Sequence, residues 1–138
     1  MAHNDHRMKR VFPSFFPKDC PPNDAQSSAD EFFRLVRADP PEDNDFRSHV
    51  EKGINGRFDR CMGSGLSVFT ELEDIYKLKR RVKAFEKRLV ARGRAEPEDG
   101  LAVHTPTKED DSHHTWWLFE GAMVAKKFVV IEDNEGKT

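Results

Sequence analysis

The pattern that most constrains the fold is one amphipathic segment that begins at Thr70. Thr70 and Glu73 have the spacing of a capping box, in which each side chain pairs with a backbone N–H group at the start of a helix. Apolar residues then recur at intervals of three and four, which places them on one side of a helix. These residues are Leu72, Ile75, Leu78, Val82, Phe85 and Leu89. The sequence therefore predicts one main helix that covers at least residues 71–81.

The segment that follows this helix allows two interpretations. Residues 87–92 could continue the helix to Gly93. They could instead form a strand that pairs with residues 101–104 through a turn at residues 96–100. We favour this hairpin.

The other apolar residues occur in short runs that are typical of strands. Residues 31–37 are ended by two prolines and are too few for an ordinary helix. Three similar runs cover residues 66–69, 113–119 and 126–131. Asp45 could cap a short helix over residues 46–52 that Gly53 closes. The sequence thus predicts an α+β fold, with one main helix on a small, mostly antiparallel sheet or a partly closed barrel.

Residues 1–29 have the composition of an extended arm. Prolines recur every few residues and exclude a long helix or a central strand. Phe12, Phe15 and Phe16 are unusual in a free tail, so they either dock on the chain itself or bind a partner. We expect docking, because exposed apolar patches are costly. One α+β domain should cover residues 30–132, followed by a polar tail at residues 133–138.

Composition excludes several classes of protein. No apolar run approaches the roughly 18–20 residues of a membrane span, and the N-terminus does not resemble a secretory signal. We therefore expect a cytoplasmic protein without membrane contact. In that reducing compartment Cys20 and Cys61 should be thiols.

Residues 77–94 form a strongly basic block. They contain nine Lys or Arg and one acidic residue, Glu86, so the block carries +8. Because the whole chain carries −2, the remainder carries −10. The block could bind nucleic acid without sequence preference, or could be a solvated face balanced by acidic loops of the same protein. The residues expected to supply any anion affinity are Lys79, Arg80, Lys83, Lys87 and Arg88.

Two adjacent histidines precede two adjacent tryptophans in the run at residues 113–119. In a strand, His113 shares one face with Trp117, and His114 shares the other with Trp116. We expect Trp116 in the core and the His113–Trp117 face on an accessible pocket wall, where a histidine can move a proton or stack on a ligand. Ordinary hydrogen-bonded histidines are the alternative, and we expect no metal site.

The order of short motifs resembles that of a group of small bacterial proteins. The motifs are GLSVF at residues 65–69, HHTWW at residues 113–117 and FVV at residues 128–130, and the resemblance spans about residues 43–131. It implies a bacterial or phage protein of the cytoplasm and no particular activity.

A second resemblance is to ADP-ribosyltransferase-type folds. In that family an Arg or His on an early strand precedes a Ser-bearing strand that runs into a helix, and a Glu follows later. Arg34 or Arg37, Ser67 and Glu120 have this order, although the Ser-Thr-Ser triplet and the Glu-x-Glu motif of the family are not present. The resemblance implies an enzyme that acts on a nucleotide such as NAD. Arg34, Ser67 and Glu120, together with His113, are the candidate catalytic residues.

These observations support three classes of function. Our first expectation is a small binding or accessory module that acts through protein contacts or self-association, because the arm is aromatic and no complete catalytic motif is present. The alternatives are the nucleotide- or NAD-directed enzyme and a nonspecific nucleic-acid binder that uses residues 77–94. The sequence identifies no cofactor.

Overall fold

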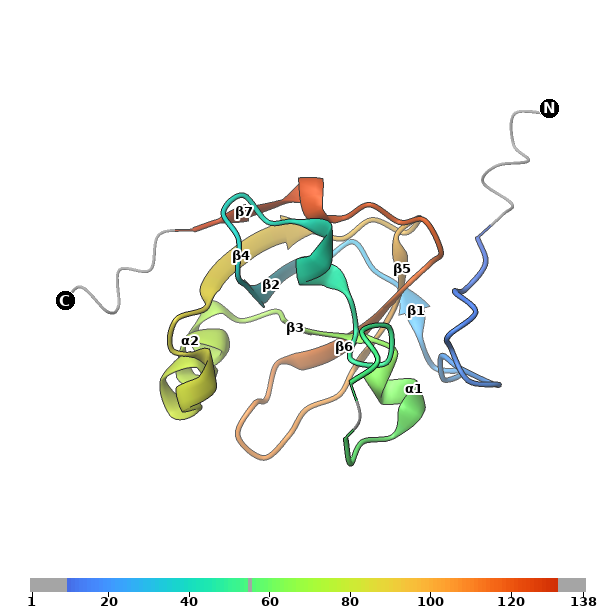
Figure 1. Cartoon of the computed structure of the whole chain (residues 1–138), viewed down its shortest axis with the longest axis horizontal. Coiled ribbons are helices and arrows are strands. Elements are labelled where there is room, and N and C mark those ends of the chain that lie inside the picture. The colour runs from blue at the N-terminus through green and yellow to red at the C-terminus, as the bar shows by residue number, and fades with distance from the viewer. Residues whose placement is uncertain (1–9, 55, 132–138) are drawn as a thin grey trace.

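Seven strands form one antiparallel sheet with one main helix packed on it (Figure 1). The computed structural model describes residues 10–54 and 56–131. The strand order is β1-β5-β6-β3-β2-β4-β7, and the sheet does not close into a barrel. This architecture confirms the α+β prediction.

The strands are β1 (Gln26–Ser27), β2 (Glu31–Val36), β3 (Leu66–Phe69), β4 (Leu89–Arg94), β5 (Gly100–His104), β6 (His113–Leu118) and β7 (Phe128–Val130). The α-helices are α1 (Arg60–Gly63) and α2 (Leu72–Arg81). Short 3-10 turns occur at η2 (Asp43–Phe46), η3 (Lys83–Phe85) and η4 (Ala125–Lys127).

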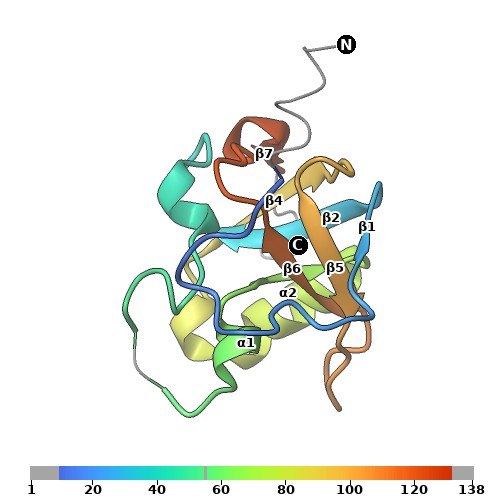
Figure 2. The same ribbon diagram turned by 90° about the vertical axis from the view of Figure 1, so that its right-hand side faces the viewer.

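The centre of the sheet is weakly joined. Strand β2 pairs with β4 from Glu31 to Val36, but its register with β3 consists of the single pair Phe33 and Phe69. The strands β1, β5, β6 and β3 therefore form one part of the sheet, and β2, β4 and β7 form the other. Figure 2 shows β2 crossing the view at a steep angle to β5 and β6. The two parts diverge beyond the Phe33–Phe69 pair.

Side-chain alternation produces one core on each face of the sheet. On one face the core contains Phe32, Val68, Trp116 and Phe128. On the other face, α2 packs Ile75 and neighbouring side chains against Phe33, Phe69 and Val90. The prediction that Trp116 lies in the core is confirmed, because it is fully buried.

The main helix forms over the predicted residues, but its predicted cap is wrong. Helix α2 has Glu71 at its N-cap position, with no side-chain cap. The hydroxyl of Ser112 accepts a hydrogen bond from the backbone N–H of Glu71 at 3.1 Å, and the backbone N–H of Ser112 donates to the Asp74 carboxylate at 3.0 Å. The N–H of Thr70 donates to the Ser112 carbonyl. A loop distant in sequence therefore satisfies groups that a capping box would have satisfied locally.

Two other local predictions are wrong. Residues 89–94 do form a strand, but β4 pairs with β2 and β7, while β5 pairs with β6 and β1, so there is no β4–β5 hairpin. The expected helix over residues 46–52 is replaced by the earlier turn η2, inside which the Asp45 carboxylate accepts the N–H of Glu42 at 3.0 Å. Gly53 does end the following turns, with a φ of 75° that favours glycine.

The described part of the arm packs on the domain, as expected. The ring of Phe12 stacks on Phe119 and on Phe16, with centroid distances of 5.1 and 5.3 Å, and Phe15 contacts Phe16 edge to face. Strand β1, which lies within residues 1–29, joins the sheet beside β5. The first nine residues and the tail at residues 133–138 lie outside the described residues.

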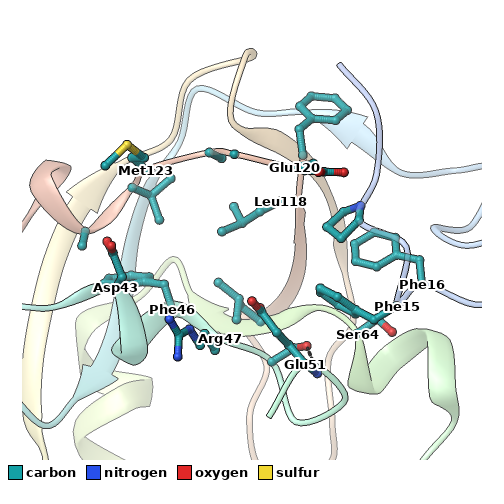
Figure 3. Close-up of a pocket in the computed structure, with 18 of the residues that line it drawn as sticks. Phe15, Phe16, Asp43, Phe46, Arg47, Glu51, Ser64, Leu118, Glu120 and Met123 are labelled. Carbon is teal, nitrogen blue, oxygen red and sulfur yellow. Dashed lines mark hydrogen bonds between the residues drawn. The ribbon is translucent and has the colours of Figure 1, made fainter. Parts of the chain in front are cut away.

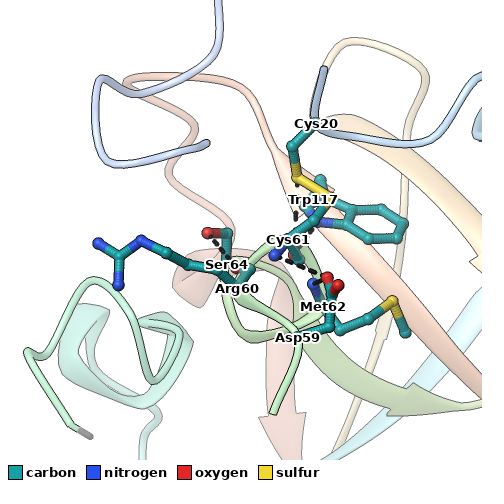
Figure 4. Close-up of a disulfide and its surroundings, with 7 residues drawn as sticks. All are labelled: Cys20, Asp59, Arg60, Cys61, Met62, Ser64 and Trp117. Carbon is teal, nitrogen blue, oxygen red and sulfur yellow. Dashed lines mark hydrogen bonds between the residues drawn. A yellow bond between two sulfur atoms is a disulfide. The ribbon is translucent and has the colours of Figure 1, made fainter. Parts of the chain in front are cut away.

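The expected thiols are instead joined in a disulfide. Cys20 and Cys61 are 41 positions apart, but their Cα atoms lie 5.5 Å from each other. The arm runs past α1 to β1 (Figure 2), and Cys20 of the arm is thereby joined to Cys61 of α1 (Figure 4). Within the described ranges, no helix has the length and apolarity needed to cross a membrane.

Candidate functional site

A cleft of about 480 Å³ opens where β2 and β3 diverge. Arg34 and Leu35 of β2 line one side, and Ser67 and Phe69 of β3 line the other. Further cationic side chains also line it, from the segment after η2 and from the segment between η3 and β4. These are Arg47, Lys52 and Arg88.

Arg34 bridges the two parts of the sheet. Its Nε donates to the backbone carbonyl of Asp45 and its Nη1 to the carbonyl of Ser67, both at 2.8 Å. Ser67 pairs with Thr115 of β6 but has no pairing partner in β2. The Arg34 side chain therefore supplies a hydrogen-bond donor to the Ser67 carbonyl in place of a neighbouring strand. The guanidinium carbon also lies 5.6 Å from the centre of the Phe46 ring. These contacts hold a positive charge beside Ser67.

Ser67 and His113 are hydrogen-bonded within the cleft. The Nε2 atom of His113 lies 2.9 Å from the Ser67 Oγ, and its Nδ1 lies 2.9 Å from the Thr105 carbonyl oxygen. The Thr105 hydroxyl lies at the same distance from Nδ1, but because a carbonyl oxygen only accepts, the contact with the carbonyl favours the tautomer with the ring proton on Nδ1. Nε2 is then an acceptor for the hydroxyl proton of Ser67. The register of β3 and β6, which pairs Phe69 with His113, makes this contact possible.

Burial keeps the histidine neutral. Burial lowers the pKa of His113 below its ordinary value of 6.5, and the bond to Thr105 and the charge of Asp110 oppose the shift only in part. The Asp110 carboxylate is itself held by Arg81 at 3.0 Å. At neutral pH, His113 is therefore in the form that can accept a proton.

Positive charges crowd one another in the cleft. Burial lowers the pKa of Arg34 to about 10, with the Arg88 charge adding to the effect and Asp45 opposing it. The pKa values of Lys52 and Arg88 are also lowered, first by burial and then by neighbouring arginines. The pKa of His49 is lowered as well, first by burial and then by the charges of Lys52 and Arg34. An anion bound here would relieve this repulsion.

Two predicted site residues lie elsewhere. Glu120 lines a different groove, of about 530 Å³, next to Phe15 and Phe16 of the arm (Figure 3). Its backbone N–H donates to Val11, so the docked arm determines its position. Trp117 is fully buried rather than accessible, because α1 covers its face of the sheet and its Nε1 donates to the Cys61 carbonyl at 2.8 Å (Figure 4).

The members of the basic block differ in their surroundings. Of the five residues expected to bind anions, Arg88 lines the cleft, whereas Lys79, Arg80, Lys83 and Lys87 do not. Several members of the block pair with acidic residues of the same chain. These pairs are Lys77 with Asp74, Arg80 with Glu73, Arg81 with Asp110 and Arg92 with Glu31.

Several residues that line the cleft or hold its histidine were not singled out from the sequence. Arg47, His49 and Lys52 lie in the segment predicted to be a helix, and Thr105 directly follows the strand expected at residues 101–104. No local pattern marks them, because their partners in the cleft are distant in sequence. Of the two arginines considered for the early strand, Arg34 lines the cleft and Arg37 does not.

In the described ranges, no group of three His, Cys, Asp or Glu side chains is arranged to hold a metal ion. Comparisons with protein-family models, with curated proteins and with solved structures found no match.

Proposed function

We propose that the cleft binds a phosphorylated ligand of the nucleotide class and that the protein is an enzyme acting on it. The observation that supports this most is the convergence of Arg34, Lys52 and Arg88 on a cleft that also contains the Ser67–His113 pair. Guanidinium groups bind phosphate through paired N–H donors, and crowded cations favour an anionic ligand.

The rest of the lining suits the remainder of a nucleotide. Phe58 and Phe85 add aromatic surface on which a base can stack. A volume of about 480 Å³ is within the roughly 300–1,000 Å³ of small-molecule sites. Because Glu120 is remote from the cleft, the proposal does not include a transfer reaction that uses this carboxylate.

The two other function classes have less support. The aromatic residues that suggested a protein partner pack against the chain's own Phe119 and against each other. The basic block that suggested nucleic acid is divided between the cleft and several intramolecular ion pairs.

Calorimetric titration with NAD, ATP and pyrophosphate tests the proposal through two neighbouring residues. Arg88 lines the cleft, and exposed Lys87 does not. We expect Arg88→Gln to weaken binding at least tenfold, which is about 1.4 kcal/mol. Lys87→Gln should change affinity less than twofold. Equal losses in the two variants would support diffuse binding by the basic block, and absence of binding to the wild-type protein would refute the proposal.

A further inference from the structure

We propose that Ser67 is a nucleophile and His113 its general base, and that the cleft transfers a phosphoryl group from a phosphate ester or anhydride to Ser67. This inference rests on the proposed function and specifies its chemistry. It assigns a role to each hydrogen-bonded atom of the pair rather than only a place in the cleft.

The geometry is that of an activated nucleophile. Such sites combine a nucleophile within hydrogen-bond reach of a base and a third group that orients the base. Here the Ser67 Oγ and the His113 Nε2 are 2.9 Å apart, and the Thr105 carbonyl holds the opposite ring nitrogen at 2.9 Å. The Ser67 residue is exposed, whereas His113 is half-buried. The base is therefore held in place and partly desolvated, while the nucleophile remains accessible to a ligand.

The surrounding charge favours phosphorus over a neutral acyl carbon as the reacting centre. Arg34 donates to the carbonyl of Ser67 itself, so its guanidinium is fixed beside the nucleophile. Arg88 and Lys52 line the same cleft. Fixed cations stabilise the negative charge that a phosphoryl group carries on its non-bridging oxygens during transfer. These cations would stabilise the reaction of a neutral acyl substrate less.

The proposed reaction consists of two balanced steps. In the first, the Ser67 Oγ attacks phosphorus and its proton passes to the His113 Nε2. A new P–O bond forms as the P–O bond to the leaving group breaks, and the leaving oxygen takes the proton from His113. In the second, water attacks the phosphoserine and gives its proton to His113. The P–Oγ bond then breaks, and Ser67 regains the proton.

A fluorophosphonate probe tests the nucleophile without a requirement for nucleotide binding. Attack by Ser67 would form a P–O bond and break the P–F bond, so one serine gains the mass of the probe less that of the hydrogen fluoride released. We expect peptide mapping to locate the label on Ser67 and the Ser67→Ala variant to remain unlabelled. His113→Gln should slow labelling at least 100-fold. His114→Gln is the matched control, because this neighbour lies on the opposite face of β6, and its rate should stay within twofold.

The reaction class is tested with two chromogenic compounds. Bis(4-nitrophenyl) phosphate should release a burst of nitrophenolate equal to the enzyme concentration and leave a phosphoryl adduct on Ser67. Acylation by 4-nitrophenyl acetate without any phosphoryl adduct would overturn the assignment to phosphorus.

The two proposals can fail separately. If pyrophosphate and nucleotides bind but neither the probe nor the phosphate ester modifies Ser67, the nucleophile is refuted and the binding site stands. If Ser67 is labelled but no nucleotide or pyrophosphate binds, the proposed function is refuted. Near-UV circular dichroism of Ser67→Ala and His113→Gln shows whether each variant keeps its fold. Loss of the label in a folded Ser67→Ala variant supports Ser67 as the nucleophile. Absence of the label from Ser67 in the wild-type protein counts against it.

Discussion

Adjacent tryptophans on β6 provide a test of how much one buried hydrogen bond stabilises this fold. Trp116 and Trp117 are both fully buried, on opposite faces of the sheet. The Nε1 of Trp117 donates to the Cys61 carbonyl at 2.8 Å, whereas the Nε1 of Trp116 has no hydrogen-bond partner in the part of the chain that the structure describes. Replacing each tryptophan with phenylalanine removes the same atoms from a buried site. The difference between the two variants therefore reports mainly on the hydrogen bond.

The expected difference follows from these two environments. Trp117→Phe removes one of two donors to the Cys61 carbonyl, which keeps the Ser64 N–H at 3.1 Å, and one net hydrogen bond contributes about 0.5–1.5 kcal/mol. Trp116→Phe removes a donor that is already unpaired, so part of its packing loss is offset. Trp117→Phe should therefore be the less stable variant by about 0.5–1.5 kcal/mol. In a domain of this size, that is roughly 2–6 °C in Tm.

Urea unfolding followed by tryptophan fluorescence measures this difference, because each variant keeps one tryptophan. The Cys20–Cys61 disulfide must be intact in both samples. Equal m-values would show that both variants expose the same surface on unfolding. Equal free energies of unfolding, or a less stable Trp116→Phe variant, would refute the reasoning.

Three further predictions concern the covalent link, one close approach and one titration. Replacing Cys20 and Cys61 with serine opens a loop with a sequence separation of 41 and should cost about 3–4 kcal/mol, and a Tm unchanged by the replacement would contradict this. Gly100→Ala should destabilise by more than about 2 kcal/mol in thermal unfolding, because its Cβ would overlap the backbone of β6. Gly121→Ala, which has open space and only the strain of a φ of 83°, should cost about 1–2 kcal/mol. Because the pKa of His113 is lowered in the folded protein, the unfolded chain takes up a proton at a higher pH than the folded chain does. The free energy of unfolding should therefore decrease as the pH falls below 6.5, and this decrease should end once the pH is below the folded pKa. His113→Gln should flatten that part of a plot of unfolding free energy against pH.

The sequence by itself determined the features that depend on local periodicity. The intervals of three and four over residues 72–81 predict α2, because they place apolar side chains on one helical face whatever the helix packs against. Alternation in the run that became β6 placed Trp116 in the core and His113 on the opposite face. The family resemblance in the order of Arg34, Ser67 and Glu120, together with His113, gave four candidates, of which Arg34, Ser67 and His113 line the same cleft.

Only the tertiary structure decided the pairings between distant segments. Strand β4 pairs with β2 and β7 rather than with the next strand in the chain, because pairing depends on which apolar faces meet and not on proximity in sequence. The Cys20–Cys61 disulfide, the burial of Trp117 beneath α1 and the replacement of the Thr70 cap by Ser112 all require contacts between residues about 40 or more positions apart. The cationic cleft depends on the same kind of contact. Arg34 and Arg88 come from different segments, and the pairing of β2 with β4, which sets Val36 opposite Leu89, brings both to the opening where β2 diverges from β3.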